Sequence, residues 1–255
     1  MAKIKTTEEI ALLRESGRRL ATVLQEVKKA ISPGITTMDL DALAEKLIRA
    51  GGDTPPFLNY TPHGARHPFP ASLCVSINDE IVHGIPSADR VIQEGDIVSI
   101  DLGLTHKGMV TDAALTVSVG EVSDDVMLLI KETERSLYEG IKAAKGGARI
   151  GDIGAAIEHV AYKHDYGVVR EMGGHGVGHA VHEEPYVPNY GRKGTGPILK
   201  PGMVLALEPM FTLGSEEIRL MPDGYTIITK DGSLAAHFEH TIVITDGGPE
   251  IVTKV

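Results

Sequence analysis

The sequence predicts an α+β protein built from two similar halves, because the same order of segments occurs twice. In each half, helical periodicity is followed by a short apolar strand and then by a carboxylate six residues after a glycine. GITTMDLDALAE (34–45) resembles GARIGDIGAAIE (147–158), and EGDIVSID (94–101) resembles PGMVLALE (201–208). Matches this short also arise by chance, so the duplication is a hypothesis that rests on both pairs together.

Composition bounds the class of protein. A chain of 255 residues with 42% hydrophobic residues can bury a full core. The formal net charge of -10 argues against a dedicated nucleic-acid binder, which needs a basic surface to neutralise phosphates. Cys74 is the only cysteine, so no intrachain disulfide forms, as is typical of a reducing cytoplasm. We find neither an apolar signal segment nor the ~20 apolar residues of a membrane span, and therefore expect a cytoplasmic protein without membrane contacts.

Two amphipathic helices are expected at the start of the first half. Thr6 and Glu9 form a capping signal, and apolar residues then recur every three or four positions up to a Ser-Pro-Gly stop at 32–34. A second helix is expected from about Thr37 to Ala50, where two glycines follow. Residues 53–70 are rich in Pro, His and Gly and predict a loop. Strands are then expected at 73–77, 96–102 and 109–119.

The second half follows the same order. Periodicity predicts one helix from about Ser123 to Ala144 and another from about Asp152 to Asp165. The remaining apolar runs predict strands, because they are short and are separated by turn residues such as Lys-Asp-Gly-Ser at 230–233. These strands are expected at 168–170, 203–210, 225–229, 238–245 and 250–253.

Two acids of the first half occupy positions where apolar side chains are expected. Asp101 ends the apolar strand DIVSIDL, and Asp112 lies within MVTDAALTV. A tight hairpin with its two-residue loop at His106 and Lys107 places the two acids directly opposite each other, unless a bulge shifts the register by one. Like charges in that arrangement destabilise a sheet, and a divalent cation between them would remove the repulsion.

Glu208 and Glu239 repeat this pattern in the second half. Glu208 follows five apolar residues, and Glu239 precedes a strand with buried character. For any one of these acids, the alternative is a strand-end residue that faces water or a basic partner. Four such acids with a histidine cluster nearby favour a metal site instead, because unpaired buried carboxylates are costly.

The histidines of EMGGHGVGHAVHEEP (171–185) complete this set. Glycines flank His175; they disfavour a helix and let other groups approach the backbone. His175 and His182 are seven residues apart, so a regular strand would point them to opposite sides. We expect one to be a ligand and the other a neighbour on a bend, with His179 structural. One histidine with four carboxylates suits one or two Mn, Fe or Co ions rather than a structural zinc site, and such a centre performs hydrolysis.

Together these stretches resemble the type I methionine aminopeptidases. The matching stretches occur in the family's order and span essentially the whole chain. They are NDEIVHGIP (78–86), GDIVSIDLG (95–103), TDAA (111–114), GGHGVGHAVHEEP (173–185), PGMVLALEP (201–209) and FEHTIVIT (238–245). The resemblance implies a pita-bread fold, with two pseudo-symmetric halves and a central antiparallel sheet covered by helices. It implies a single catalytic domain over residues 1–255, with halves of roughly 1–120 and 121–255.

The resemblance also implies an activity. Enzymes of this family remove the initiator methionine from nascent proteins when the second residue is small, by attack of a metal-activated hydroxide on the first peptide bond. Carried over by position, the ligands of two divalent ions (Co, Mn, Fe or Zn) fall on Asp101, Asp112, His175, Glu208 and Glu239. The resemblance further implies catalytic roles for three residues. Glu208 would move a proton from water to the leaving amine, His182 would stabilise the oxyanion, and His83 would contact the substrate near its amino end or its leaving nitrogen.

The family's methionine pocket maps onto four further residues. These are Phe57, Tyr60, Cys74 and Tyr225. Tyr225 replaces a tryptophan that is common in the family, and Val181 replaces a phenylalanine of some members. The loop at 56–72 is longer than in compact members, and we expect its His63 and His67 to be solvated rather than ligands. The remaining histidines are expected to be structural or surface residues: His106, His159, His164, His237 and His240.

Expected partners and two alternatives complete the sequence predictions. The resemblance implies nascent polypeptide N-termini as substrate, transient docking to ribosomes and no specific nucleic acid; nothing indicates an obligate interface, so we expect a monomer. One alternative is a proline-specific relative such as aminopeptidase P or prolidase, which usually carries an additional N-terminal domain that this chain lacks. NDEIVHGIP (78–86) favours the methionine enzyme. The other alternative is a binding protein that has lost catalysis, and the presence of all five ligands argues against it.

Overall fold

The computed structural model describes residues 3–62 and 64–254. Its centre is an eight-stranded antiparallel sheet in the order β1-β3-β4-β13-β8-β6-β7, with β14 paired to β13. The strands of this sheet are β1 (Leu73–Ile77), β3 (Ile97–His106), β4 (Met109–Ser118), β6 (Gly173–Gly176), β7 (Glu183–Pro188), β8 (Val204–Leu207), β13 (Glu239–Thr245) and β14 (Gly248–Ile251).

Two three-stranded sheets accompany the central one. Their orders are β10-β11-β2 and β12-β9-β5. The strands are β2 (Glu80–Val82), β5 (Gly167–Val168), β9 (Met210–Thr212), β10 (Ile218–Leu220), β11 (Ile227–Thr229) and β12 (Ala235–His237).

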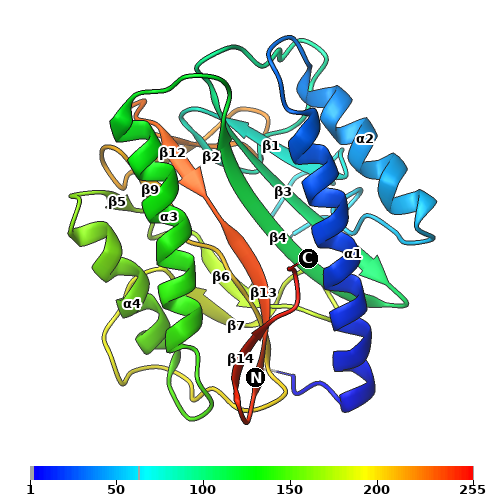
Figure 1. Cartoon of the computed structure of the whole chain (residues 1–255), viewed down its shortest axis with the longest axis vertical. Coiled ribbons are helices and arrows are strands. Elements are labelled where there is room, and N and C mark those ends of the chain that lie inside the picture. Colours follow the sequence, from blue (N-terminus) through cyan, green and yellow to red (C-terminus); the bar gives the residue numbers. More distant parts are fainter. Residues whose placement is uncertain (1–2, 63, 255) are drawn as a thin grey trace.

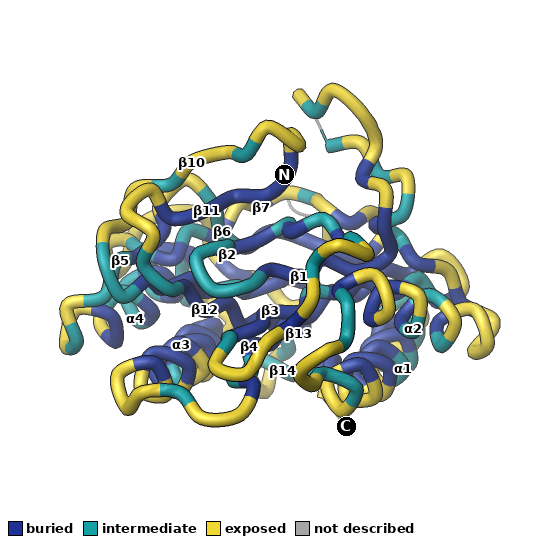
Figure 2. Tube along the Cα trace, turned by 90° about the horizontal axis from the view of Figure 1, so that it is seen from above, coloured by how far each residue is buried: buried dark blue, intermediate teal, exposed yellow. Residues whose placement is uncertain are grey.

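Four helices cover one face of the central sheet, as Figures 1 and 2 show. They are α1 (Thr7–Ala30), α2 (Thr37–Ala50), α3 (Asp124–Ala143) and α4 (Ile150–Tyr162). Helices α1 and α2 pack on β1, β3 and β4, whereas α3 and α4 pack on each other and on strands of the second half. The opposite face of the sheet carries no helix among residues 3–62 and 64–254, and the loops of that face surround the cavity described below.

The helices form where the sequence predicts them, for identifiable local reasons. Thr6 accepts a hydrogen bond from the amide of Glu9, and the Glu9 carboxylate accepts one from the amide of Thr6, which closes the predicted capping box of α1. The apolar stripe of α1 buries Leu13, Leu20 and Val27 completely. No helix of the described residues is both long and apolar enough to cross a membrane.

The second helix of each half starts in the same way. Thr36, the residue before α2, forms an isolated antiparallel bridge with Val91. Arg149, the residue before α4, forms one with Ile198. In both helices an aspartate three residues further on accepts a hydrogen bond from the amide of that bridging residue, at 3.0 Å for α2 and 2.7 Å for α4. The two predicted repeat segments therefore make the same local contacts.

Several predicted boundaries are wrong. Helix α4 spans Ile150–Tyr162 rather than 152–165, and the strand expected at 96–102 continues to His106. The strand expected at 203–210 is two strands, β8 and β9, because Pro209 has no amide hydrogen to continue a ladder. Five strands are not among those predicted: β2, β6, β7, β10 and β12. All five have six residues or fewer, so their periodicity is too short to detect.

The predicted hairpin register is also wrong. The loop lies at Lys107 and Gly108, one residue later than expected, so that His106 pairs with Met109. Asp101 therefore lies opposite Ala114 rather than Asp112. Both residues of the loop have positive φ, 47° and 83°, which suits the turn that joins twisted strands. A shift of two positions keeps both acids on one face, and they become diagonal neighbours.

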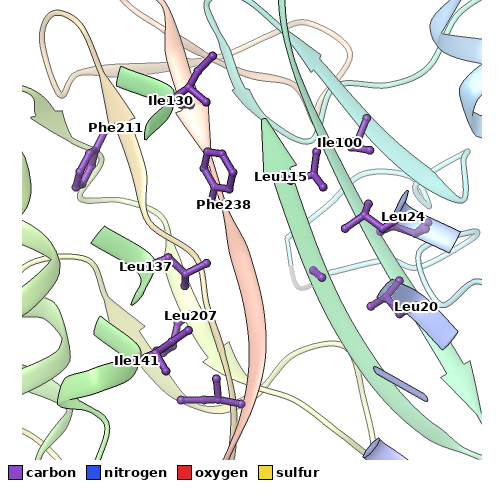
Figure 3. Packing of buried hydrophobic residues seen from close by; sticks show 14 of the residues in the cluster. Leu20, Leu24, Ile100, Leu115, Ile130, Leu137, Ile141, Leu207, Phe211 and Phe238 are labelled. Atoms are coloured by element: carbon purple, nitrogen blue, oxygen red, sulfur yellow. The ribbon is translucent and has the colours of Figure 1, made fainter. Parts of the chain in front are cut away.

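The main core lies between the helices and the sheet. Figure 3 shows Leu20 and Leu24 of α1 against the β3–β4 hairpin, and Ile130, Leu137 and Ile141 of α3 beside the strands of the second half. Alternate residues of β3 and β4 face this core, so the residues between them face the other side of the sheet. This alternation places Asp101 and Asp112 on the face without helices.

Candidate active site

Asp101, Asp112 and Glu239 converge on the helix-free face of the sheet around a small residue, Ala114. Ala114 of β4 lies opposite Asp101 on β3 and opposite Glu239 on β13. Asp112 lies two residues before Ala114 and therefore points to the same face. The Thr241 hydroxyl accepts from the amide of Asp112 at 2.9 Å and donates to its carbonyl at 2.8 Å, which fixes β4 against β13. The methyl group of Ala114 leaves room for the three carboxylates around it.

His175 and Glu208 reach the same place from the second half. His175 on β6 lies opposite Ala206 on β8, and Glu208 follows two residues after Ala206. His175 Nε2 lies 3.6 Å from Glu208 Oε1. His175 Nδ1 donates to the carbonyl of Gly176 at 2.8 Å, so Nε2 carries the lone pair that faces the acids. A Cβ on Gly174 would lie 2.3 Å from the carbonyl oxygen of Ala206, so the predicted close approach at the glycines exists.

The ionised form of the four acids is unfavourable when no cation is bound. Burial, followed by the neighbouring carboxylates, raises the pKa of Asp101 and of Glu239 well above the usual range. Burial and the charge of Asp112 do the same to the pKa of Glu208. Burial raises the pKa of Asp112 to about 7. Four carboxylates that repel one another and are short of water favour either a proton or a cation between them.

The unsatisfied atoms of this cluster match a cation site. Asp101 Oδ1, Asp112 Oδ1 and Glu239 Oε1 are buried and have no hydrogen-bond partner among the described residues. One ligand atom each of Asp112, His175 and Glu239 lies within 4.8 Å of the others. Burial lowers the pKa of His175 to about 3, so its imidazole is neutral and able to coordinate. Buried oxygens without partners, beside a neutral imidazole, are the ligand set of a divalent metal, and these residues therefore fit one.

A single cavity of about 590 Å³ holds every site residue that the sequence predicts. The five ligand candidates Asp101, Asp112, His175, Glu208 and Glu239 line it, together with His83, His182, Phe57, Tyr60, Cys74 and Tyr225. Part of the cavity depends on Gly103, which lies opposite Asp112; a Cβ there would lie 2.9 Å from Phe57 Cε1. The sheet therefore provides the acids, and the 56–72 loop provides an apolar wall beside them.

His175 and His182, the two histidines of the 171–185 stretch expected to act together, meet across the bend between β6 and β7. The rings of His175 and His182 lie edge to face, with centroids 4.5 Å apart. The hydroxyl of Tyr60 lies 2.8 Å from His182 Nδ1. His83 lines the same cavity, and burial lowers its pKa to about 4, so it is neutral. His179 faces away and pairs with Glu9 at 2.7 Å.

Sequence reasoning missed one residue of this centre. His237, expected to be structural or superficial, is 1% exposed, and its Nε2 lies 3.7 Å from Glu208 Oε2 without a hydrogen-bond partner. Burial lowers its pKa to about 3. Its position two residues before Glu239 was the available signal, because residues two apart on a strand share a face. Phe69 also lines the cavity and was not singled out.

The other predicted histidines fall outside the centre. His63 lies outside the described residues. His67 bonds the carbonyl of Asp223 at 3.0 Å and packs against Tyr225, so it is a loop contact rather than a ligand. His106 Nδ1 lies 2.7 Å from the Asp53 carboxylate, and His240 bonds Thr253, as expected for structural residues.

The fold and the buried acid–histidine cluster together define the class of protein, a metal-dependent hydrolase. The family model described as Metallopeptidase family M24 matches residues 11–246, and the chain belongs to this family. The chain is 47% identical over 251 residues to methionine aminopeptidase 1 of Bacillus subtilis, with 98% of each chain covered. It superimposes on the crystal structure of methionine aminopeptidase from Thermotoga maritima with a TM-score of 0.96 and 41% identity, and all of both chains is covered.

A more distant likeness concerns the fold alone. The Xaa-Pro dipeptidase from Bacillus anthracis has a TM-score of 0.77 and 24% identity, and it covers 99% of this chain but 62% of its own. Structures of both kinds share a curled antiparallel sheet with helices on it, the pita-bread fold, so the predicted fold class is confirmed. The predicted resemblance to the methionine aminopeptidases is confirmed as well. The family and the cluster of Asp112, His175 and Glu239 also support the use of a divalent metal.

Proposed function

We propose that this protein removes the N-terminal methionine from nascent polypeptides whose second residue is small. The observation that carries this proposal is the single cavity in which an apolar pocket adjoins the buried acids and His175. Phe57, Phe69 and Tyr225 provide aromatic walls, which make favourable contacts with a thioether. The names of the similar proteins from Bacillus subtilis and Thermotoga maritima support the same substrate.

The proposal assigns two divalent ions to the centre, with Co, Mn, Fe or Zn as the metal. Asp101, Asp112, His175, Glu208 and Glu239 would hold them. The three unpartnered carboxylate oxygens and the raised pKa values of the acids support this assignment. When bound, such ions supply a Lewis acid and lower the pKa of water.

The side chains around the centre would orient the substrate and move the proton. Glu208 would accept a proton from the attacking water and pass it to the leaving amine, because its raised pKa favours the protonated form of this carboxyl. When the Tyr60 hydroxyl donates to Nδ1 of His182, the ring proton lies on Nε2. His182 would then donate to the scissile carbonyl and stabilise the oxyanion that develops there. His83 would contact the substrate near its amino end.

We further propose that residues 1–255 act as one catalytic domain with related halves of roughly 1–120 and 121–255. The equivalent bridges before α2 and α4 support this duplication, and each half contributes an acid six residues after a glycine. The proposal includes a monomer in the cytoplasm that docks transiently at ribosomes, where nascent N-termini emerge. The buried free thiol of Cys74 is compatible with a reducing compartment.

Chelator-stripped protein provides the test. Mn, Co, Fe or Zn would be added back separately, and free methionine released from Met-Ala-Ser, Met-Leu-Ser and the control Ala-Pro-Ser would be measured. We expect metal-dependent release from Met-Ala-Ser, little from Met-Leu-Ser, and no cleavage of the proline peptide. Cleavage of Ala-Pro-Ser alone would assign the protein to its proline-specific relatives. Bound metal without cleavage of any peptide would refute the proposed activity.

A further inference from the structure

The loop that carries His182 is held by one buried carboxylate. We call residues 177–182, which join β6 to β7, the histidine loop. Glu183, the next residue, turns its side chain back onto this loop and accepts from the amide of His179 at 2.6 Å and from that of Ala180 at 3.2 Å. Both bonds involve the same oxygen, Oε1. The conformation of the loop therefore depends on where the Glu183 side chain is fixed.

Lys5 fixes that side chain from the start of the chain. Lys5 Nζ donates to Glu183 Oε2 at 2.6 Å, and the side chains of the two residues are only 1% and 4% exposed. The amide of Lys5 donates to the carbonyl of Gly202 at 2.8 Å, so the segment is itself anchored just before β8. Since a buried charge without a partner is costly, this geometry holds each ion in place through the other.

The histidine loop is shaped to accept the lysine. Gly178 has a φ of +139°, and a Cβ there would lie 2.5 Å from the Cε of Lys5. The carbonyl of Gly178 accepts from the amide of Val110, next to the strand segment that carries Asp112. The Lys5 stem thus occupies the space that a side chain at 178 would fill, and the loop passes between Lys5 and β4.

A second contact ties the same segments together at the surface. His179 Nε2 lies 2.7 Å from Glu9 Oε1, in the first turn of α1, and these side chains are 35% and 29% exposed. The segment from Lys5 to Glu9 therefore contacts the histidine loop and the adjoining Glu183 through two ion pairs, one buried and one partly exposed. On the far side of the loop, His182 lies against His175 and Tyr60.

We propose that Lys5 is a positioning residue: through Glu183 it fixes the histidine loop, and so holds His182 where it contacts the substrate. Lys5 does not line the cavity, whereas its partner Glu183 does. We therefore expect Lys5 to act indirectly, through Glu183 and the histidine loop that carries His182. The effect on rate rests on the proposed function, whereas the effect on the His182 ring does not. If the Lys5–Glu183 pair were only structural, its loss would lower the stability of the protein without changing the position of His182. This difference is testable.

A double-mutant cycle that combines substitutions of Lys5 and His182 distinguishes a positioning role from a purely structural one. We expect Lys5→Met to lower kcat for Met-Ala-Ser roughly 10- to 100-fold, because small displacements of a catalytic group cost rates of that order, with KM changed less than about threefold. In a His182→Ala background, Lys5→Met should have no further effect on kcat. Lys3→Met removes the same charge from an exposed position two residues away and should leave kcat within about twofold in both backgrounds. An equal loss of kcat in both backgrounds would overturn the proposal.

Two further measurements keep the proposal testable. If Lys5→Met does not fold, Glu9→Gln breaks the exposed contact to His179 instead; we expect a smaller loss of kcat that also disappears with His182→Ala. In protein labelled with ¹⁵N-histidine, Lys5→Met should shift the ring resonances of His182 and leave those of His106 unchanged. Unchanged His182 resonances would overturn the positioning role, whatever the activity of the wild-type protein. Absence of methionine release by the wild-type protein would refute only the proposed activity.

Discussion

The buried carboxylate of Glu183, the residue after His182, and the four acids of the centre differ in their partners. Glu183 is paired with Lys5; burial alone would raise its pKa, but the bonds from Lys5 and from the His179 amide hold the pKa below its usual value. The four acids of the centre have no lysine or arginine partner among the described residues, and their pKa values are raised. The buried carboxylate of Glu183, which fixes a loop of the fold, is neutralised by a lysine of the same chain. Where the chain leaves carboxylates unpaired, the cation comes from outside.

This comparison predicts opposite signs for the same kind of substitution. Neutralising one member of the Lys5–Glu183 pair strands the other charge in a buried place, which destabilises the fold. Neutralising one acid of the centre relieves repulsion in the metal-free protein, which stabilises it, but removes a proposed metal ligand. Stability and activity should therefore change together at the pair and in opposite directions at the centre.

The largest effect is expected for Asp112→Asn. Loss of a ligand removes part of a Lewis-acid effect worth several kcal/mol, so the rate of methionine release should fall by roughly 10³-fold or more. At pH 8 the metal-free variant should melt at a higher temperature than the metal-free wild type, because a buried charge has been removed. Steady-state kinetics and thermal melts check the two parts, with the exposed Asp89→Asn as control. Full activity, or a lower melting temperature without metal, would contradict the metal assignment.

The next effect is the stability of the paired site. Lys5→Met should lower the free energy of unfolding by about 3–5 kcal/mol, since it leaves Glu183 buried without its partner. Urea unfolding at pH 7 measures this change, and Lys3→Met should change stability by less than about 0.5 kcal/mol as an exposed control. The loss should be similar with and without divalent metal, because the pair lies outside the acid cluster. A loss that vanishes on adding metal would show that the two sites are not separate.

The pH dependence of the metal-free protein sharpens the contrast. The pKa of Asp112 is raised from 3.8 to about 7, so folding favours its protonated form, and the stability this contributes is lost as pH rises through about 7. Buried histidines with lowered pKa values act in the opposite sense at acidic pH, so the comparison must be made between variants. The melting temperature of metal-free Asp112→Asn should exceed that of the wild type by about 5 °C or more at pH 8, and by much less at pH 4.5. A gap that does not change with pH would show that Asp112 is ionised without metal.

The sequence predicts the centre better than its surroundings, for a physical reason. An acid inside an apolar strand departs from the expected pattern of burial, so Asp101 and Glu208 stand out in the sequence alone. The four helices were found because capping residues and a period of 3.6 are local properties. The contact between Asp101 and Ala114 was not found, because the position of a two-residue loop sets the register of the whole hairpin.

Residues that act through distant partners left no such signal. Lys5 and Glu183 are 178 residues apart, and each alone is an ordinary charged residue near a helix start or in an acidic run. For His237, the spacing of two residues to Glu239 indicates only a shared face of a strand, whereas the approach of its Nε2 to Glu208 depends on the tertiary structure. Long-range pairs of this kind follow from tertiary structure, and only the coordinates of both partners identify them.

The smallest effect tests the pocket rather than the charges. The Tyr225 hydroxyl donates to the carbonyl of His67, and its ring packs against Phe69 with centroids 5.1 Å apart, so it fastens the 56–72 loop over the cavity. Tyr225→Phe keeps the aromatic wall and removes one hydrogen bond worth about 0.5–1.5 kcal/mol. We expect KM for Met-Ala-Ser to rise roughly 2- to 10-fold with kcat unchanged, because the part of the loop that Tyr225 holds is proposed to contact the methionine side chain rather than the reacting atoms. Tyr138→Phe, on the helix side of the sheet, is the matched control. A fall in kcat with unchanged KM would instead assign Tyr225 to the reaction itself.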